Sequence, residues 1–523
     1  MPPRQKKSTG REKASNTPTS EELKVFLWKA ADKLRGSVDA ALFKDLVLAL
    51  VFLKYVSDAF EHRRNDLARK LAADGVPDDR VRRLLENPES YTGAGVFWVP
   101  EVARWSWIAS SARSGRVGRL LDEAAAAVMR DNASLRGVVP AEIFDHDDID
   151  QRRLAELVDL FDDARFLGPG GTPARNALRE MYEYFLGNYA RAEGRRGGDF
   201  YTPPSVARLI VEILEPVGGR VYDPVCGSGG LLVQAAKYVE QRLGPDHTAD
   251  IALYGQEINA RTWRLARMNL AMHGIDGDLG IRWADTLDDD KHPDLNADFV
   301  MASPPFNVKD WAWDPSDSRW RYGIPPKNNA NYAWLQHAVS KLSNQGTAAV
   351  LLTNGSTSST RAEREIRRAM VEADLVAAVV ALPTQLHYTT QIPTSLWLLA
   401  KDKSPQGKMG LTDRRGDVLF IDARATGVMH NRTERVLTDI DLSRIAEVYH
   451  AWRGTGSARA ASLEYVDEPG FSFSTDTAAV HEQGYNLTPG RYVGVARQTG
   501  VRPSSDVREE SLSLMRDLYA IFD

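Results

Sequence analysis

The chain has 523 residues, 43% of them hydrophobic and 26% charged, values typical of a globular protein with two or three domains. No apolar stretch is long enough to cross a bilayer, and the basic N-terminus lacks the apolar core of a secretory signal. A single cysteine, Cys226, excludes a disulfide framework and a zinc site built on several cysteines. We therefore expect a cytoplasmic protein without a bound metal.

The net charge of −5 bears on the kind of partner. A chain with this balance lacks the basic excess of a protein that binds nucleic-acid phosphates unaided. If the chain acts on DNA, a local basic face or a partner protein must supply much of the electrostatic attraction.

The first part of the chain is predicted to be helical. Residues 1–18 are polar and basic, so we expect a disordered tail, which is either simply solvated or a DNA-binding arm. From 19 to 166 apolar residues recur every three or four positions, as in Phe43, Leu46 and Val47, which predicts an all-α domain. The Gly- and Pro-containing stretch 167–176 predicts a linker.

From 177 to 430 short apolar runs alternate with helical segments, which predicts a mostly parallel sheet covered by helices on both faces. The expected strands are 219–223, 251–255, 297–301, 347–352, 375–380, 395–400 and 418–422, and the expected helices are 231–243, 260–273, 333–342 and 362–372. The region 431–523 reads as helices and loops and ends in an amphipathic helix over 509–523. That last helix suits either docking on a partner or packing within the chain.

A glycine-rich turn follows the strand that ends in Asp223, in the sequence Asp223-Pro-Val-Cys-Gly-Ser-Gly-Gly. Ligands of open α/β sheets bind at the carboxyl ends of the strands, where Gly227, Gly229 and Gly230 allow close approach of the backbone. Leu232 stands where a dinucleotide motif needs glycine or alanine, and no lysine follows for a phosphate-binding loop. A carboxylate before the turn suits a cationic ligand instead, such as an amino-acid ammonium.

A second acid, Glu257, comes at the end of the next expected strand, where a carboxylate can accept both hydroxyls of a ribose. Either acid alone is better explained as a solvated loop residue. The two acids together, one strand–helix unit apart, indicate a ligand with a ribose and an ammonium. These groups point to S-adenosylmethionine rather than to a nicotinamide dinucleotide.

The tetrapeptide Ser303-Pro304-Pro305-Phe306 follows a third expected strand. The two prolines make a stiff loop that presents carbonyl groups, and such a loop alone is as readily a structural turn as a site. Beside the glycine turn it suits methyl transfer to an exocyclic amino nitrogen. Ser303 Oγ and the Pro304 carbonyl would accept the amino hydrogens and localise the lone pair, while Phe306 stacks on a base flipped from the duplex.

Together these segments resemble the DNA amino-methyltransferases, which carry a D/N/S-P-P-Y/F/W tetrapeptide, and most closely the modification (M) subunits of type I restriction–modification systems. The segment 198–204 (Gly-Asp-Phe-Tyr-Thr-Pro-Pro) resembles the F-Y-T-P segment of that family, and 223–230 resembles its D-P-x-x-G-S-G-G. Segments 27–36 and 52–60 are similar to its helical domain, and 485–492 to its C-terminal region. The resemblance covers most of residues 20–495.

The resemblance implies the fold of an S-adenosylmethionine-dependent methyltransferase. This is a Rossmann-like, doubly wound α/β sheet that is mostly parallel, with an N-terminal all-α domain and C-terminal helices. The implied reaction is methyl transfer to N6 of adenine in a specific DNA sequence. The resemblance implies that the cofactor-binding residues are Phe200, Tyr201, Thr202, Asp223, Gly227, Ser228, Gly229, Gly230, Glu257 (ribose) and Asp285 (adenine), and that Ser303, Pro304, Pro305 and Phe306 are catalytic.

M subunits of this kind work with a specificity (S) subunit that reads the DNA sequence, commonly as two M with one S. A restriction (R) subunit adds cleavage. A partner of this kind would explain how an acidic chain acts on double-stranded DNA, with the helical domain closing over the duplex and the last helix docking on the S subunit.

One residue departs from the family pattern, because Ser303 stands where the family usually has asparagine. Serine at this position is frequent in relatives that methylate cytosine N4. Two alternatives therefore stay open: an N4-cytosine methyltransferase, and a cofactor-binding structural subunit that has lost catalysis. An RNA or small-molecule methyltransferase is less suitable, since neither substrate requires the helical N-terminal domain.

Overall fold

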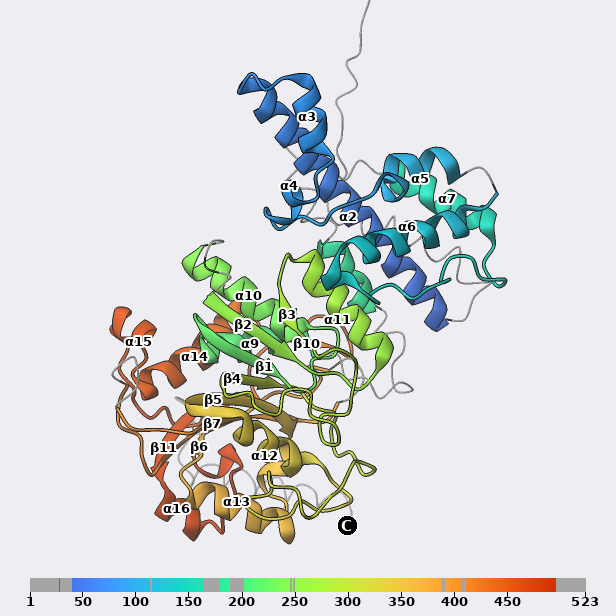
Figure 1. The fold of residues 1–523 in the computed structure, drawn as a ribbon. Coiled ribbons are helices and arrows are strands. Elements are labelled where there is room, and N and C mark those ends of the chain that lie inside the picture. Colours follow the sequence, from blue (N-terminus) through green and yellow to red (C-terminus); the bar gives the residue numbers. More distant parts are fainter. Residues whose placement is uncertain are drawn as a thin grey trace, which may run out of the picture.

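The computed structural model describes residues 28, 40–112, 115–163, 179–188, 202–244, 247, 250–387, 391–405 and 411–494. The predicted tail 1–18, the linker 167–176, the residues Phe200 and Tyr201, and the terminal helix 509–523 lie outside these ranges. Figure 1 shows a group of helices at the top, in blue and teal, and a large sheet covered by helices below it.

The helical part is built around one long helix, α2, which runs from Ala40 to Ala73 and is fully buried over 46–53, in its first half. The other elements are α3 (Asp78–Leu85), α4 (Glu89–Thr92), η1 (Glu101–Ala103), α5 (Trp105–Ser111), α6 (Val117–Asp131), η3 (Ala133–Leu135) and α7 (Gln151–Asp163). Helices end at turn signals of the sequence, since α2 stops before Asp74-Gly75 and α4 stops before Gly93. No strand occurs in the described residues of 40–163, so this part is all-α as predicted.

The sheet has nine strands in the order β11-β8-β6-β7-β5-β4-β1-β2-β3. The strands are β1 (Gly219–Asp223), β2 (Ile251–Gly255), β3 (Gly277–Asp278), β4 (Ala297–Ala302), β5 (Leu342–Thr353), β6 (Val376–Ala381), β7 (Thr394–Ala400), β8 (Asp417–Asp422) and β11 (Ser472–Asp476). Strands β3, β2, β1, β4 and β5 are parallel neighbours, and β6 is parallel to β8. β7 runs antiparallel to β5 and β6, and β11 antiparallel to β8. The mostly parallel, doubly wound sheet is thus confirmed.

Helices cover both faces of this sheet (Figure 1). The helices of this part are α9 (Pro204–Leu214), α10 (Gly230–Leu243), α11 (Ala260–Met272), α12 (Asn331–Lys341), α13 (Ala362–Glu372), α14 (Asp439–Arg453), α15 (Gly456–Ala460) and α16 (Thr477–Glu482). Short elements complete the order: η6 (Asn354–Thr357), η7 (Pro489–Arg491) and a separate ribbon of β9 (Val428–Met429) and β10 (Arg435–Val436). One apolar core packs α9, α10 and α14 on one face, and another packs α12 and α13 on the other.

The described residues beyond 430 belong to the same cores as the sheet. Leu442 and Ile445 of α14 are buried in the core with α9, and β11 extends the sheet at β8. Leu487 and Val493 pack on the opposite face. The C-terminal part therefore completes the sheet-containing part of the structure up to residue 494.

Helix α11 joins the two parts of the molecule. Its residues Leu265, Met268 and Met272 are buried in the core of the helical part. The Tyr182 hydroxyl donates to the Leu265 carbonyl at 3.2 Å, and Arg267 donates to the Arg136 carbonyl at 2.7 Å. The helical part is thus fixed to the helix that starts directly after β2.

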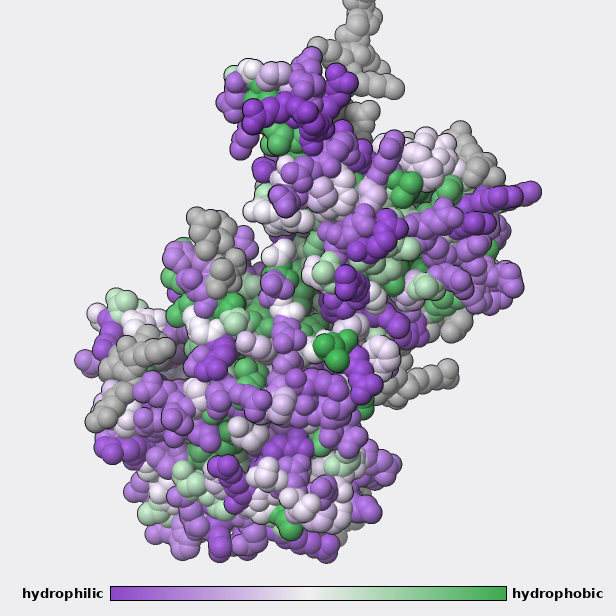
Figure 2. Space-filling view, in the orientation of Figure 1, coloured by the Kyte–Doolittle hydropathy of each residue, from purple (hydrophilic) through white to green (hydrophobic). Residues whose placement is uncertain are grey.

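On the face of the molecule that Figure 2 shows, hydrophilic residues predominate over both the helical part and the sheet-containing part. Among the described helices, none combines the length and the hydrophobicity that a membrane span requires.

Candidate active site

A cavity of about 250 Å³ opens where strands β1, β2 and β4 reach their carboxyl ends. The predicted site residues that line it are Thr202, Asp223, Gly227, Ser228, Gly230, Glu257, Asp285, Ser303 and Pro305. Segments far apart in the sequence therefore meet here, because parallel strands place all their carboxyl ends at one edge of the sheet.

The other predicted residues lie close to this cavity or outside the described residues. Gly229 adopts φ +79° and caps the N-terminus of α10, a backbone conformation that favours glycine. Pro304 is buried, and Phe306 packs edge-on against His387 with ring centroids 5.4 Å apart. Phe200 and Tyr201 lie outside the described residues.

Asp223 is 1% exposed at the end of β1. Its Oδ1 accepts a hydrogen bond from the Val225 N–H at 3.0 Å, and its carbonyl accepts one from the Gln256 N–H at 3.0 Å. Burial raises the pKa of this carboxyl to about 8, with a further increase from the nearby Glu257 charge. A buried acid of this kind favours a cation as its ligand, since a positive charge would offset the cost of ionisation.

Glu257 links the glycine turn to the start of α11. Its Oε2 accepts from the Gly227 N–H at 3.1 Å, and its Oε1 accepts from the Asn259 N–H at 2.8 Å. Asn259 in turn caps α11 through hydrogen bonds from the N–H groups of Arg261 and Thr262. These two hydrogen bonds hold the side chain in place, and a carboxylate has about four acceptor sites in all, which suits the binding of hydroxyl groups.

Gln256 is a site residue that the sequence analysis missed. It is fully buried, and its Nε2 donates to the carbonyls of Ala284 and Asp289 at 3.2 and 2.8 Å. Its Oε1 accepts from the Lys291 N–H at 2.9 Å. One amide thereby fixes the loop that carries Asp285 to the end of β2. The sequence placed Gln256 beside Glu257 but gave no sign of these long-range partners.

Ser303 follows β4, and its side chain is 6% exposed. Its Oγ is buried with no hydrogen-bond partner, although buried polar atoms are nearly always paired. The indole Nε1 atoms of Trp311 and Trp334, two further residues that line the cavity, are buried and unpartnered as well. Unpaired polar atoms gathered at one cavity are typical of a site that completes its hydrogen bonds with a ligand.

His387 is the neighbour of Phe306 and was not predicted. It is 5% exposed, its Nε2 has no partner, and burial lowers its pKa to about 4. The imidazole is therefore neutral at physiological pH, and it supports the ring of Phe306 from the side. Some eighty positions separate the two residues in the sequence, so no local pattern could link them.

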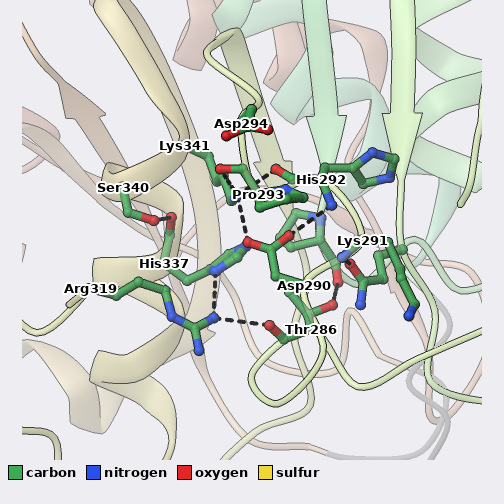
Figure 3. A network of polar contacts seen from close by, with 12 residues as sticks. Thr286, Asp290, Lys291, His292, Pro293, Asp294, Arg319, His337, Ser340 and Lys341 are labelled. Atoms are coloured by element: carbon green, nitrogen blue, oxygen red, sulfur yellow. Dashed lines mark hydrogen bonds and ion pairs between the residues drawn. The ribbon is translucent and has the colours of Figure 1, made fainter. Parts of the chain in front are cut away.

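A polar network adjoins the cavity, because it includes Thr286, which also lines the cavity (Figure 3). Arg319 donates to the carbonyls of Thr286 and Leu287, at 2.9 and 2.6 Å, and also to His337 Nδ1 at 3.1 Å. Because Nδ1 accepts from arginine, the remaining ring N–H of His337 is free to donate to the Tyr222 hydroxyl, 3.3 Å away. Burial and the arginine charge lower the pKa of His337 to about 3, so the ring stays neutral.

Two family models match the chain. The model described as "N-6 DNA Methylase" matches residues 173–500, more than half of the chain, and the model described as "HsdM N-terminal domain" matches residues 23–161. The chain belongs to the N-6 DNA methylase family. The two matches correspond to the sheet-containing part and to the helical part of the structure.

Relatives of this methylase are subunits of type I restriction enzymes. The chain is 42% identical to the type I restriction enzyme HindI methylase subunit of Haemophilus influenzae over 77% of the chain and 89% of that relative. It is 34% identical to the MjaIX methylase subunit of Methanocaldococcus jannaschii over 91% and 84%. The crystal structure of a type I methyltransferase subunit from Streptococcus thermophilus superposes with a TM-score of 0.71, at 27% identity, over 91% and 100% of the two chains.

The family membership confirms the activity that the motifs predicted. The chain is a type I restriction–modification methylase subunit that methylates N6 of adenine in DNA. The N-6 match does not favour the N4-cytosine alternative that Ser303 had left open.

Proposed function

We propose that the cavity binds S-adenosylmethionine and that residues 303–306 present the adenine amino group to it. The observation that carries the proposal is the meeting of Asp223, Glu257, Asp285 and Ser303 around one cavity. Three carboxylates suit a ligand with a net positive charge, and the unpartnered Ser303 Oγ suits an amino donor.

When bound, the cofactor supplies an activated methyl group on a sulfonium. Asp223 would accept from its ammonium, and Glu257, whose two oxygens are held by backbone N–H groups, would accept from its ribose hydroxyls. Asp285 would accept from its adenine amino group. The position of Asp285 is set by the Leu287 N–H at 2.9 Å and by Gln256, which anchors the loop of Asp285.

Ser303 and Pro304 act on the DNA base. The Ser303 Oγ and the Pro304 carbonyl accept the two amino hydrogens of the flipped adenine, which localises the nitrogen lone pair towards the methyl group. Phe306 stacks on the base, and His387 keeps the Phe306 ring in place. Transfer then depends mainly on positioning and on electrostatics rather than on a covalent intermediate.

The proposed assembly includes a specificity subunit, a restriction subunit and two methylase subunits for each specificity subunit. Two observations support this assembly. The net charge of −5 requires another source of attraction to DNA, and the relatives are subunits of type I restriction enzymes. The helix predicted over 509–523, which lies outside the described residues, is the proposed docking segment for the specificity subunit.

The test is transfer of a radiolabelled methyl group to DNA by the methylase reconstituted with its specificity subunit. We expect Ser303→Ala to lower the rate roughly 100-fold, as for loss of one transition-state hydrogen bond, without changing cofactor affinity. Ser303→Asn should keep substantial activity because its amide oxygen is also an acceptor. The exposed Ser318→Ala is the matched control. A Ser303→Ala variant as fast as the parent would refute the role of this loop.

A further inference from the structure

The cavity is lined by one cationic side chain among the described residues, Lys44 of helix α2. Four acids line the same cavity: Asp223, Glu257, Asp285 and Asp310. Lys44 comes from the helical part of the molecule, whereas all four acids come from the sheet-containing part. The helical part therefore contributes a charge to the cavity that the catalytic fold does not provide.

The chain beside Lys44 is anchored to the sheet-containing part through Asp45, the next residue. Asp45 accepts from Arg261 Nε at 2.8 Å, and the Arg261 N–H donates to Asn259 Oδ1 at 2.9 Å. Asn259 is itself held by Glu257 Oε1. A continuous series of hydrogen bonds thus runs from Asp45, the residue beside Lys44, to Glu257 after β2. These bonds fix the start of α2 relative to the cavity.

The amino-acid end of S-adenosylmethionine carries a carboxylate as well as an ammonium. The acids of the cavity suit the ammonium but repel the carboxylate. Part of the glycine turn is already used, since the Gly227 N–H donates to Glu257 and the Gly229 N–H to the Cys226 carbonyl. A carboxylate among four acids needs a positive partner, and a lysine ammonium provides charge-assisted hydrogen bonds to it.

We propose that Lys44 binds the carboxylate of the cofactor and so joins the helical part to the catalytic part through the ligand. The inference rests on the proposed function, because it assumes that this cavity holds S-adenosylmethionine. It adds a residue from outside the methyltransferase fold to the cofactor site, and it makes the contact between α2 and α11 part of cofactor binding.

The experiment compares two ligands that differ only in this carboxylate. Calorimetry on the full chain measures the affinities of S-adenosylmethionine and of its decarboxylated form for the parent and for Lys44→Met. We expect Lys44→Met to weaken binding of S-adenosylmethionine 10- to 100-fold and to change binding of the decarboxylated form less than threefold. Lys44→Arg should retain most of the affinity. Lys70→Met, on the exposed end of the same helix, should bind both ligands like the parent.

Other results would overturn the inference. An equal loss of affinity for both ligands would mean that Lys44 supports the cavity wall and does not bind the carboxylate. Unchanged affinity for both ligands would exclude a contact between Lys44 and the cofactor. Weaker DNA binding with unchanged cofactor affinity would assign Lys44 to a DNA phosphate instead. If the parent chain binds neither ligand, the proposed function fails, and this result is distinct from a failure at Lys44.

Discussion

Single residues decide the chemistry at this site, and Asp223 shows how. The carboxyl group is buried against Glu257 with one backbone hydrogen bond, an arrangement that costs stability while the cavity holds no cation. Such a cost is common where a protein keeps a group ready for a ligand rather than for its own fold.

The raised pKa of Asp223 predicts that this residue lowers the stability of the free subunit while it favours binding of the cofactor. In the folded chain the carboxyl keeps its proton up to about pH 8, whereas in the unfolded chain it loses it near pH 4. The folded state therefore binds more protons between these values, and the stability of the free subunit falls as the pH rises from about 4 to 8. Asp223→Asn should remove this slope and stabilise the free subunit at pH 8 by roughly 1–3 kcal/mol.

Urea denaturation of parent and variant at pH 5 and pH 8 measures the slope, and calorimetry measures the binding. We expect Asp223→Asn to lose S-adenosylmethionine affinity by more than about 100-fold, since an amide cannot replace the ion pair with the ammonium. A variant that is less stable than the parent at pH 8, or that binds the cofactor equally well, would contradict this account of Asp223.

Many residues that line the cavity could be predicted from the sequence, because the motifs that contain them are short stretches of chain. A strand, its terminal acid and its glycine turn lie within about a dozen positions, as Asp223 and Gly230 do. Gln256, Arg319 and His387 were missed because their partners lie roughly 30 to 80 positions away. Only the folded chain brings such pairs together.

Elements were predicted best where hydrophobic periodicity and burial agree. The bounds of β1, β2 and α13 are those expected, because apolar runs between turn signals determine them. β11 was not predicted, since Ser472-Phe-Ser-Thr-Asp has a single large apolar residue and gains its place by pairing with β8. The antiparallel direction of β7 also follows from pairing, which periodicity does not encode.

The segment between β4 and α12 contains no helix or strand, and the polar network in Figure 3 anchors it. Arg319 belongs to this segment and grips the carbonyls of Thr286 and Leu287, which line the cavity. Thr286 also donates to the Pro224 carbonyl at 2.5 Å. Arg319 is therefore a positioning residue that joins the loop after Ser303 to the loop of Asp285.

Substitution of Arg319 should weaken the cofactor site without removing a ligand contact. We expect Arg319→Met to lower S-adenosylmethionine affinity about tenfold and stability by roughly 2 kcal/mol, because two carbonyls lose their donor. Arg319→Lys should recover only part of the affinity, since one ammonium cannot match the fork of the guanidinium. The exposed neighbour Arg321→Met is the control in calorimetry and urea denaturation. Parental affinity in Arg319→Met would contradict this role.

On the scale of the whole molecule, the helical part and the sheet meet at α11, the helix that begins beside Glu257. The sequence predicted both parts and the break between them, but it did not predict their contact, because Asp45 and Arg261 are far apart in the chain. Lys44, near the start of α2, lines the cavity. The proposed contact of Lys44 with the carboxylate would therefore make the helical part a contributor to the cofactor site.

The most direct test of the central claim is a crystal structure of the chain with S-adenosylhomocysteine, the product of methyl transfer. We expect the product in the cavity at the ends of β1, β2 and β4, with its ammonium on Asp223, its ribose hydroxyls on Glu257 and its adenine beside Asp285. Product bound at any other site, or in this cavity with the adenine turned towards Ser303, would contradict it.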